Sequence, residues 1–431
     1  MICSELITLP SSSTNVRFLP YNSPIAASKD TVRNELYRRL VSGLDARDEI
    51  GDEELYGRID RLIFQEGRAY KLSYGEMLKY RKLLFAALRG LDVLALPMED
   101  PHVTEIMVNG PEDIYLEKEG RITRFDDRFS SPDKLSDVVQ AIASRVNRRI
   151  NEASPMVDAR LSDGSRVNVV IPPVAIDGPC VTIRRFPENP MSMEDLIRIG
   201  SVTEECAAFL RKLVEARYNI FISGGTGAGK TTFLGALSGF IPEDERVITI
   251  EDSAELRLRN VRNLVRLESR PANLEGDYEV TIRDLIRNAL RMRPDRIVVG
   301  EIRGEEALDM LQAMNTGCDG SLSTGHANSA KDMISRIETM VLMGKDLPLQ
   351  AVRKQIASAI DIFIHLSRMR DRTRKVTGIY EVAGMREGEV ALDPLYEFRE
   401  TEEAEDRVEG TLVRTGELQH TAKLLARNGR L

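Results

Sequence analysis

The spacing of apolar residues changes along the chain and divides it into segments of different character. Residues 1–30 are rich in Ser, Pro and Asn and show no regular apolar spacing, which predicts a disordered tail. Residues 31–95 include RNELYRRLVSGL and YGEMLKYRKLLFAALRGL, where apolar positions recur every three or four residues. This period is typical of amphipathic helices, so we expect a small helical bundle that ends where Pro97 and Pro101 interrupt helix formation.

The apolar pattern becomes that of strands over residues 96–186. Short β-rich runs such as VTEIMVNG, DIYLEKEGRITRF and DARLSDGSRVNVVI occur here, and the dipeptides EG and DG within them favour tight turns. One helical segment, PDKLSDVVQAIASRVNRRI, lies among these strands. The pattern therefore predicts a small α+β domain. The segment PENPMSMEDLIRIG, which contains two prolines, predicts a linker over 187–200.

Helices and apolar strands alternate over residues 201–400. The helical segment EECAAFLRKLVEA precedes the strand NIFIS, and the strands RVITIED, IVVG and SLSTGH follow, with helices predicted at 281–293 and 304–316. This alternation predicts an α/β fold in which helices cross over between parallel strands. DIFIHLSR and KVTGIYEVAG, after residue 360, predict additional strands. Residues 401–431 are charged and are interpreted as a C-terminal tail.

Composition and charge narrow the class of protein. The 431-residue chain has a formal net charge of −8, so it lacks the general basic excess of many nucleic-acid-binding proteins. None of the four cysteines forms a CxxC pair, which argues against a zinc site or a disulfide framework. No apolar run is long enough to cross a bilayer, and the N-terminal segment lacks the apolar core of a signal peptide. We therefore expect a cytoplasmic protein.

The segment SGGTGAGKTT, residues 223–232, matches the phosphate-binding pattern G-x-x-x-x-G-K-[ST]. Its glycines allow backbone N–H groups to turn toward phosphate oxygens, Lys230 is placed to bind the β- and γ-phosphates, and the Thr231 hydroxyl to bind Mg²⁺. A strand precedes the segment and a helix follows, which favours ATP binding over a glycine-rich turn without a ligand. The candidate nucleotide-binding residues are Gly224, Gly225, Thr226, Gly227, Ala228, Gly229, Lys230, Thr231 and Thr232.

Acidic residues follow two of the predicted strands. Glu251 and Asp252 end the run RVITIED, and Glu301 follows IVVG. Because the carboxyl ends of parallel strands face the ligand crevice, we expect these carboxylates near the nucleotide, where they bind the metal or orient the attacking water. The spacing does not decide which glutamate has which role. The alternatives are a helix cap or surface turn for the first pair, and an ion pair with Arg303 for Glu301.

Two further kinds of side chain are candidates for contacting the triphosphate. His326 lies in GSLSTGHANS, after another predicted strand, where a neutral imidazole is able to sense or orient the γ-phosphate. The alternative is a histidine that only satisfies a turn. Phosphoryl transfer also needs positive charge beyond that of the loop lysine, and the alternative for each arginine is ordinary surface charge. The candidate arginines of the α+β domain are Arg160, Arg166, Arg184 and Arg185.

These blocks together resemble a known family. GGTGAGKTT, ITIEDSAEL and RMRPDRIVVGEIRGEEALDMLQAMNTGCDGSLSTGHANS are similar to the Walker A, aspartate, atypical Walker B and histidine boxes of the secretion ATPases, which drive type II secretion, type IV pili and type IV secretion. VTEIMVNGPEDIYLEKEGRI, INEASPMVDARLSDGSRVNVVIPP and IETMVLMGKDLPLQAVRKQIASAIDIFIHLSR resemble in particular the CpaF/TadA branch, which powers tight-adherence (Flp) pilus assembly. The resemblance covers about residues 95–385.

The resemblance assigns roles to the acidic residues and the histidine. It implies a RecA-like P-loop ATPase domain preceded by a PAS-like α+β domain. In this family the Walker B acid is a glutamate that acts as general base or orients water, and Glu301 matches it. Glu251 matches the glutamate near Mg²⁺, with Asp252 beside it, and His326 matches the histidine of its box.

The resemblance also bears on the arginines and on one cysteine. Arg166 and Arg184 match the family arginines that the N-terminal domain places over the nucleotide across the linker, and Arg160 and Arg185 are secondary candidates. Many relatives have a histidine where this chain has Cys318, so no role is assigned to that position. The chain lacks the tetracysteine insert of type II secretion ATPases, which favours the pilus-type branch.

The resemblance implies a cytoplasmic homohexameric motor that hydrolyses ATP with Mg²⁺ and docks peripherally at the inner membrane. Its expected partners are the polytopic platform proteins of a pilus or secretion system, and a localisation or scaffold protein at the N-terminal helices. A nucleic-acid translocase or helicase is an alternative, but the chain shows little of the basic, aromatic-interleaved sequence expected of it, so no nucleic-acid partner is expected. A small-molecule P-loop kinase is a further alternative, although such enzymes are usually more compact.

Overall fold

The structure is a computed structural model of the chain, and it describes residues 29–44, 50–118, 120–146, 148–186, 190–270, 279–403 and 407–428. Nearly all of the predicted tail over 1–30, and part of the predicted linker over 187–200, lie outside the described residues. The first compact unit holds the described residues up to Asp163 together with Val167–Arg184, and the second holds Gly164–Arg166 together with the described residues from Arg185 onward. The chain therefore consists of two compact units.

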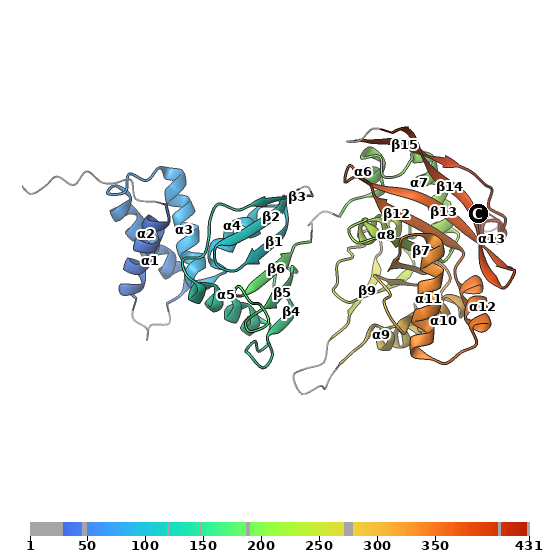
Figure 1. Ribbon diagram of the computed structural model, residues 1–431, viewed down its shortest axis with the longest axis horizontal. Coiled ribbons are helices and arrows are strands. Elements are labelled where there is room, and N and C mark those ends of the chain that lie inside the picture. Colours follow the sequence, from blue (N-terminus) through green and yellow to red (C-terminus); the bar gives the residue numbers. More distant parts are fainter. Residues whose placement is uncertain are drawn as a thin grey trace, which may run out of the picture. The chain divides into compact units, whose positions relative to one another are not determined.

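The first unit begins with helices, as the apolar spacing predicts. Leu36 and Ile59 are fully buried between them. Ser73 precedes the third helix in a capping box, because its side chain accepts from the backbone N–H of Glu76 and the Glu76 carboxylate accepts from the backbone N–H of Ser73. Pro97 lies in the first turn of the last short helix, where proline is tolerated. The elements are α1 (Lys29–Ser42), α2 (Asp52–Gly67), α3 (Tyr74–Arg89), the 3₁₀ helix η1 (Asp92–Leu94) and α4 (Ala95–Glu99) (Figure 1).

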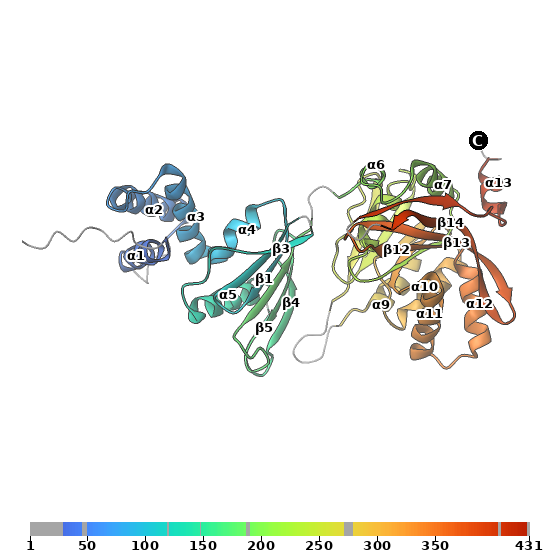
Figure 2. The ribbon, with the colours of Figure 1, turned by 45° about the horizontal axis from the view of Figure 1, so that its top comes forward.

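A six-stranded sheet and one helix complete the first unit. The elements are β1 (Val103–Asn109), β2 (Asp113–Lys118), β3 (Arg121–Arg124), α5 (Pro132–Arg145), β4 (Met156–Arg160), β5 (Arg166–Val170) and β6 (Cys180–Arg184). The strand order is β3-β2-β1-β6-β5-β4. Leu135 and Ile142 of α5 share a buried cluster with Ile106 and Val181 of the sheet, so the helix covers one sheet face (Figure 2). This arrangement is α+β.

The second unit is built around a nine-stranded sheet. Its strands are β7 (Ile220–Gly224), β8 (Arg246–Glu251), β9 (Asn263–Glu268), β10 (Arg296–Val299), β11 (Leu322–His326), β12 (Ile362–Arg368), β13 (Arg374–Arg386), β14 (Glu389–Glu403) and β15 (Val408–Arg414). The order is β15-β14-β13-β12-β7-β11-β10-β8-β9. The strands from β12 to β9 in this order pair in parallel, whereas β13, β14 and β15 extend the sheet by antiparallel pairing. The predicted α/β fold is confirmed.

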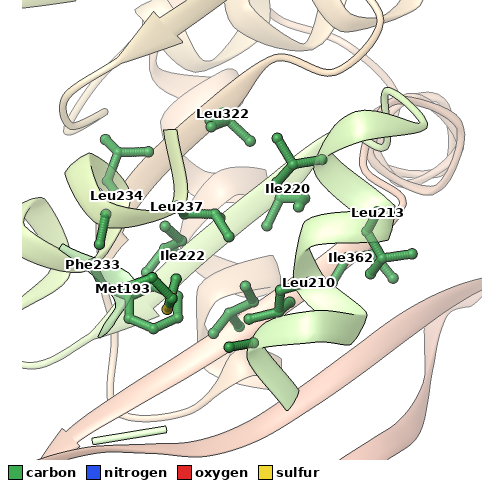
Figure 3. Packing of buried hydrophobic residues seen from close by; sticks show 14 of the residues in the cluster. Met193, Leu210, Leu213, Ile220, Ile222, Phe233, Leu234, Leu237, Leu322 and Ile362 are labelled. Atoms are coloured by element: carbon green, nitrogen blue, oxygen red, sulfur yellow. The ribbon is translucent and has the colours of Figure 1, made fainter. Parts of the chain in front are cut away.

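Helices cover both faces of the parallel strands. They are α6 (Met193–Arg198), α7 (Glu204–Glu215), α8 (Lys230–Ser238), α9 (Ile282–Ala289) with η2 (Leu290–Met292), α10 (Glu306–Asn315), α11 (Ala330–Gly344), α12 (Leu349–Ala359) and α13 (Ala422–Asn428). Leu210 of α7 and Leu234 of α8 share a buried cluster with Ile220 and Ile222 of β7 (Figure 3). The intervening Phe221 belongs to the cluster on the opposite face. Burial on both faces explains why β7 reads as an unbroken apolar run.

The second unit includes residues that the sequence pattern placed elsewhere. β15 lies within the predicted tail over 401–431, and α6 lies within the predicted linker over 187–200. Met193 and Leu196 of α6 are buried in the core of this unit. The sequence of β15 was interpreted as a tail because an edge strand exposes polar side chains, which leaves little of the apolar pattern typical of strands.

Candidate nucleotide-binding site

The glycine-rich segment forms a loop between the end of β7 and the start of α8. Gly227 and Gly229 have φ angles of +70° and +91°, which residues with a side chain rarely adopt. A side chain at Gly224 would collide with the carbonyl oxygen of Leu366 on β12, so the loop also needs glycine where it leaves the sheet. The first turn of α8, which begins at Lys230, presents free N–H groups and a positive dipole end to this loop. The loop has the features of an anion-binding cradle.

Lys230 folds over the loop and is only 7% exposed. Its Nζ donates to the carbonyl oxygen of Gly225 at 3.1 Å, and lies 3.1 Å from Nδ1 of His326. Burial lowers the pKa of Lys230, and the nearby Glu301 carboxylate opposes this shift. Both hydrogen-bond acceptors of the ammonium are uncharged, so phosphate oxygens are stronger acceptors that would replace them.

Glu301 follows β10 and lies between a histidine and an arginine. Its Oε1 is 2.9 Å from Nε2 of His326, at the end of β11. Its Oε2 accepts from Nη2 of Arg303 at 2.8 Å, so the ion pair that was the alternative for Glu301 is present. Although Oε1 is buried and close to the imidazole, it receives no well-aligned hydrogen bond from any described residue. A buried carboxylate oxygen of this kind is suited to accept a hydrogen bond from water.

His326 connects the loop lysine to the carboxylate. Burial lowers the pKa of His326, while Glu301 opposes the shift. A neutral imidazole whose Nδ1 accepts from Lys230 carries its proton on Nε2, which faces Glu301. Lys230, His326, Glu301 and Arg303 therefore form one continuous chain of polar contacts.

Glu251 ends β8 and is 3% exposed. Its Oε1 accepts from the backbone N–H groups of Glu255 and Leu256, both at 3.0 Å. Burial nevertheless raises the pKa of Glu251 to about 7, and the two backbone hydrogen bonds act in the opposite direction. A side chain at Gly300 would press against Glu251, so the end of β8 lies against the segment that leads to Glu301. These two hydrogen bonds stabilise the turn after β8, so Glu251 also has the structural role that was the alternative to a place near the nucleotide.

The candidate metal ligands are hydroxyl and carboxylate oxygens. Asp252 is exposed, accepts from the hydroxyl of Ser269 at 2.8 Å and lies 3.4 Å from a terminal nitrogen of Arg303. Thr231 is the second residue of α8, and its hydroxyl has no hydrogen-bond partner among the described residues. In the described ranges no group of three or more His, Cys, Asp or Glu side chains is arranged to hold a metal. These donors fit Mg²⁺, which usually takes one or two protein oxygens together with phosphates and waters.

The candidate arginines gather at one edge of the six-stranded sheet. Arg160 ends β4 and Arg166 begins β5, separated by five residues, so these neighbouring strands are antiparallel. The nine residues between β5 and β6 are also too few for a parallel crossover, which places Arg184, the last residue of β6, at the same edge. Arg185 follows directly. The apolar pattern of the sequence alone did not predict that these arginines lie at the same edge of the sheet.

Three residues beside the loop were not identified from the sequence as part of the site. Arg374 of β13 donates from Nε to the carbonyl oxygen of Gly227 at 3.0 Å, and Arg368 of β12 also lies beside Gly227. His365 of β12 is buried, with its Nδ1 2.9 Å from the hydroxyl of Ser223. The one signal for the arginines was the basic run SRMRDRTRK, whose placement depends on the pairing of β12 with β7.

Comparisons with known proteins show the family to which the chain is related. A family profile described as "Type II/IV secretion system protein" matches residues 92–413. A putative conjugal transfer protein of Mycobacterium tuberculosis is 36% identical over 320 residues, which are 73% of this chain and 90% of that protein. The type IV secretion system protein VirB11 of Brucella suis is 31% identical over 324 residues, which are 69% of this chain and 87% of that protein.

A solved structure is also similar to part of the chain. It is the crystal structure of the VirB11 ATPase from the Brucella suis type IV secretion system in complex with sulphate. It has 30% sequence identity and a TM-score of 0.38, and the alignment covers 67% of this chain and 95% of that chain.

Proposed function

Because this chain belongs to the type II/IV secretion system protein family, we propose that it is a motor ATPase of a pilus-assembly or secretion machine. The chain is an ATPase. The finer assignment, to tight-adherence (Flp) pilus assembly, is supported by the segments VTEIMVNG and IETMVLMG described above. A role in conjugal transfer or type IV secretion is the second candidate, which the names of the relatives favour.

One observation carries the catalytic proposal: the chain of contacts that joins Lys230 to Glu301 through His326. Lys230 neutralises charge on the β- and γ-phosphates. Oε1 of Glu301 receives no well-aligned hydrogen bond from the described residues, so it is able to orient the attacking water and accept its proton. Arg303 holds the other carboxylate oxygen in place. The γ-phosphate competes with His326 for the lysine Nζ, so the histidine responds to whether that phosphate is present.

Magnesium is a proposed cofactor of the same site. Bound Mg²⁺ would neutralise charge on the β- and γ-phosphates. The Thr231 hydroxyl is the proposed direct ligand, and the carboxylates of Glu251 and Asp252 hold waters of the ion or bind it directly. Glu251 is suited to a water-bridged contact because its Oε1 already accepts hydrogen bonds from two backbone N–H groups.

The arginine edge of the six-stranded sheet supplies the remaining positive charge. Arg166 and Arg184, with Arg160 and Arg185 as secondary candidates, contact the triphosphate and leave when it is hydrolysed. Hydrolysis thus becomes a change in the arrangement of the two units. In a homohexamer these changes act on polytopic membrane platform proteins, and the N-terminal helices are free to bind a localisation protein. In the described part of the chain no helix is both long and apolar enough to span a bilayer, so the proposed membrane contact is peripheral.

The proposal is tested by ATP hydrolysis of the purified chain with Mg²⁺ and with a chelator. Wild type hydrolyses ATP only with Mg²⁺, and Lys230→Ala lowers the rate by at least about 100-fold because the transition state loses its main cation. Lys331→Ala removes an exposed lysine of α11 and keeps the wild-type rate. Hydrolysis by Lys230→Ala at the wild-type rate would contradict the proposal.

A second experiment identifies the machine. Full-length Glu301→Gln is loaded with ATP in cells, and the membrane proteins that co-purify with it are identified. Recovery of tight-adherence platform proteins supports the finer proposal, whereas recovery of conjugation or type IV secretion components supports the second candidate.

A further inference from the structure

The phosphate-binding strand β7 has different neighbours on its two sides. β11, which ends at His326, lies on one side, and β10 lies beyond it. Glu301 and Arg303 follow β10, and we call His326, Glu301 and Arg303 the reactive flank. β12 lies on the other side, where Leu366 pairs with Gly224 at the start of the loop. The chain then turns through residues 369–373 and returns as β13. This turn therefore lies at the same sheet edge as the phosphate-binding loop.

Two arginines of this hairpin lie beside the loop, and we call Arg368 and Arg374 the arginine flank. Nε of Arg374 donates to the carbonyl oxygen of Gly227 at 3.0 Å. The aliphatic carbons of Arg374 are also the nearest neighbours of Gly229, with Cδ 3.6 Å from the position a Cβ would take there. A terminal nitrogen of Arg368 lies 4.0 Å from the corresponding position at Gly227. Both positions need glycine for their positive φ angles, and both arginine side chains lie beside this part of the loop.

The arginine flank carries charge that no carboxylate neutralises. Within the described residues neither Arg368 nor Arg374 has an ion pair, and both are exposed. The neighbouring Arg370 differs, because its guanidinium pairs with Glu400. Asp371, the acidic residue of the turn, accepts hydrogen bonds from Thr373 and from the backbone of β15. Two unpaired guanidinium groups beside a phosphate cradle are an arrangement that attracts phosphate oxygens.

We infer that Arg368 and Arg374 bind the α-phosphate end of the nucleotide, on the side of the loop opposite the reactive flank. This inference rests on the proposed function. Lys230, His326 and Glu301 mark where the γ-phosphate reacts, and the phosphate chain passes over the loop backbone, so the nucleoside end leaves on the β12 side. The hydrogen bond to Gly227 fixes one edge of the Arg374 guanidinium and leaves its terminal nitrogens for phosphate oxygens.

The position of the arginine flank separates affinity from hydrolysis. Charge that contacts the α-phosphate stabilises ATP, ADP and the transition state equally, because this phosphate does not change during γ-phosphoryl transfer. Loss of either arginine should therefore raise KM and the Kd of both nucleotides by the same factor and leave kcat nearly unchanged. An arginine that acted at the γ-phosphate would lower kcat and weaken ATP more than ADP.

The test measures Kd for ATP and for ADP, together with KM and kcat, in the full-length chain and in Arg368→Ala and Arg374→Ala. Each variant should bind both nucleotides about tenfold more weakly, the usual effect of losing a charge-assisted hydrogen bond. Arg372→Ala is the matched control, because it removes an exposed arginine of the same turn that makes no contact with the loop. Its affinities should equal those of wild type.

Several outcomes would overturn the inference. Equal Kd values in wild type and both variants would leave the arginines without a role in binding. A fall in kcat with unchanged Kd, or a larger loss for ATP than for ADP, would place them at the γ-phosphate instead. The side chain of Arg368 makes no hydrogen bond to any described residue, whereas that of Arg374 does, so Arg368→Ala keeps the test valid if Arg374→Ala fails to fold. If wild type itself bound neither ATP nor ADP, the proposed function would fail first, a result distinct from equal binding by all variants.

Discussion

The two flanks of β7 differ in how their charged side chains are partnered. On the reactive flank Glu301 contacts both His326 and Arg303, and its side chain is only 20% exposed. On the arginine flank Arg368 and Arg374 are exposed and have no carboxylate partner among the described residues. Side chains that hold one another in place are suited to chemistry, which requires fixed geometry. Open cations are suited to binding, because the ligand provides the missing negative charge.

The largest expected effect comes from Glu301→Gln, which tests the reactive flank. The amide keeps the shape of the side chain but no longer takes a proton from water, so kcat should fall by roughly 10³-fold with little change in ATP affinity. Steady-state hydrolysis and equilibrium binding measure the two quantities. Glu305→Gln changes a nearby glutamate that pairs with Arg283 and should keep the wild-type rate. Turnover by Glu301→Gln close to wild type would remove the assigned role.

Arg166→Ala and Arg184→Ala test whether charge from the arginine edge of the six-stranded sheet completes the reactive flank. If these arginines stabilise the transition state, each variant should lower kcat by about 10- to 100-fold. ATP hydrolysis at saturating substrate is the measurement. Arg121→Ala is a matched control, since Arg121 is an exposed arginine of β3 at the other end of the strand order. Unchanged rates in both Arg166 and Arg184 variants would show that the nucleotide-binding unit supplies its own cations.

A smaller effect is expected from Glu251 and depends on pH. The pKa of Glu251 is about 7 in the folded chain, against an ordinary value of 4.5. Between these two pH values the carboxyl is mostly protonated in the folded state and mostly ionised in the unfolded state. The stability from this group is fully present below about pH 4.5 and is lost as pH rises through 7. Glu251→Gln, which cannot ionise, should therefore gain roughly 2 kcal/mol relative to wild type between pH 5 and pH 8. Thermal unfolding of both proteins at the two pH values measures the difference, and a pH-independent difference would contradict the raised pKa.

The loop and the parallel strands were predictable because both are encoded locally. The spacing of Gly224, Gly229 and Lys230 is specific to a phosphate cradle, and β7 is a continuous apolar run. Contacts between distant segments were harder to predict without a family resemblance. Lys230 and His326 are 96 residues apart and meet because β7 pairs with β11.

The arginine flank shows what the sequence pattern could not provide. Arg374 is 147 residues from Gly227, and the run SRMRDRTRK reads as an exposed basic turn. Its position beside the loop follows from the pairing of β12 with β7, which apolar periodicity does not specify. The edge strand β15 was missed for a related reason, since polar residues on its exposed face hide the strand pattern.

The separation of chemistry from affinity is tested most directly by measuring kcat and nucleotide Kd side by side in Glu301→Gln and Arg374→Ala. If the reactive flank performs the chemistry, Glu301→Gln should lower kcat and keep the wild-type Kd for ATP. If the arginine flank provides affinity, Arg374→Ala should keep kcat and raise the Kd values of ATP and ADP by one common factor. If both variants changed the same quantity, the division between the two flanks would be contradicted.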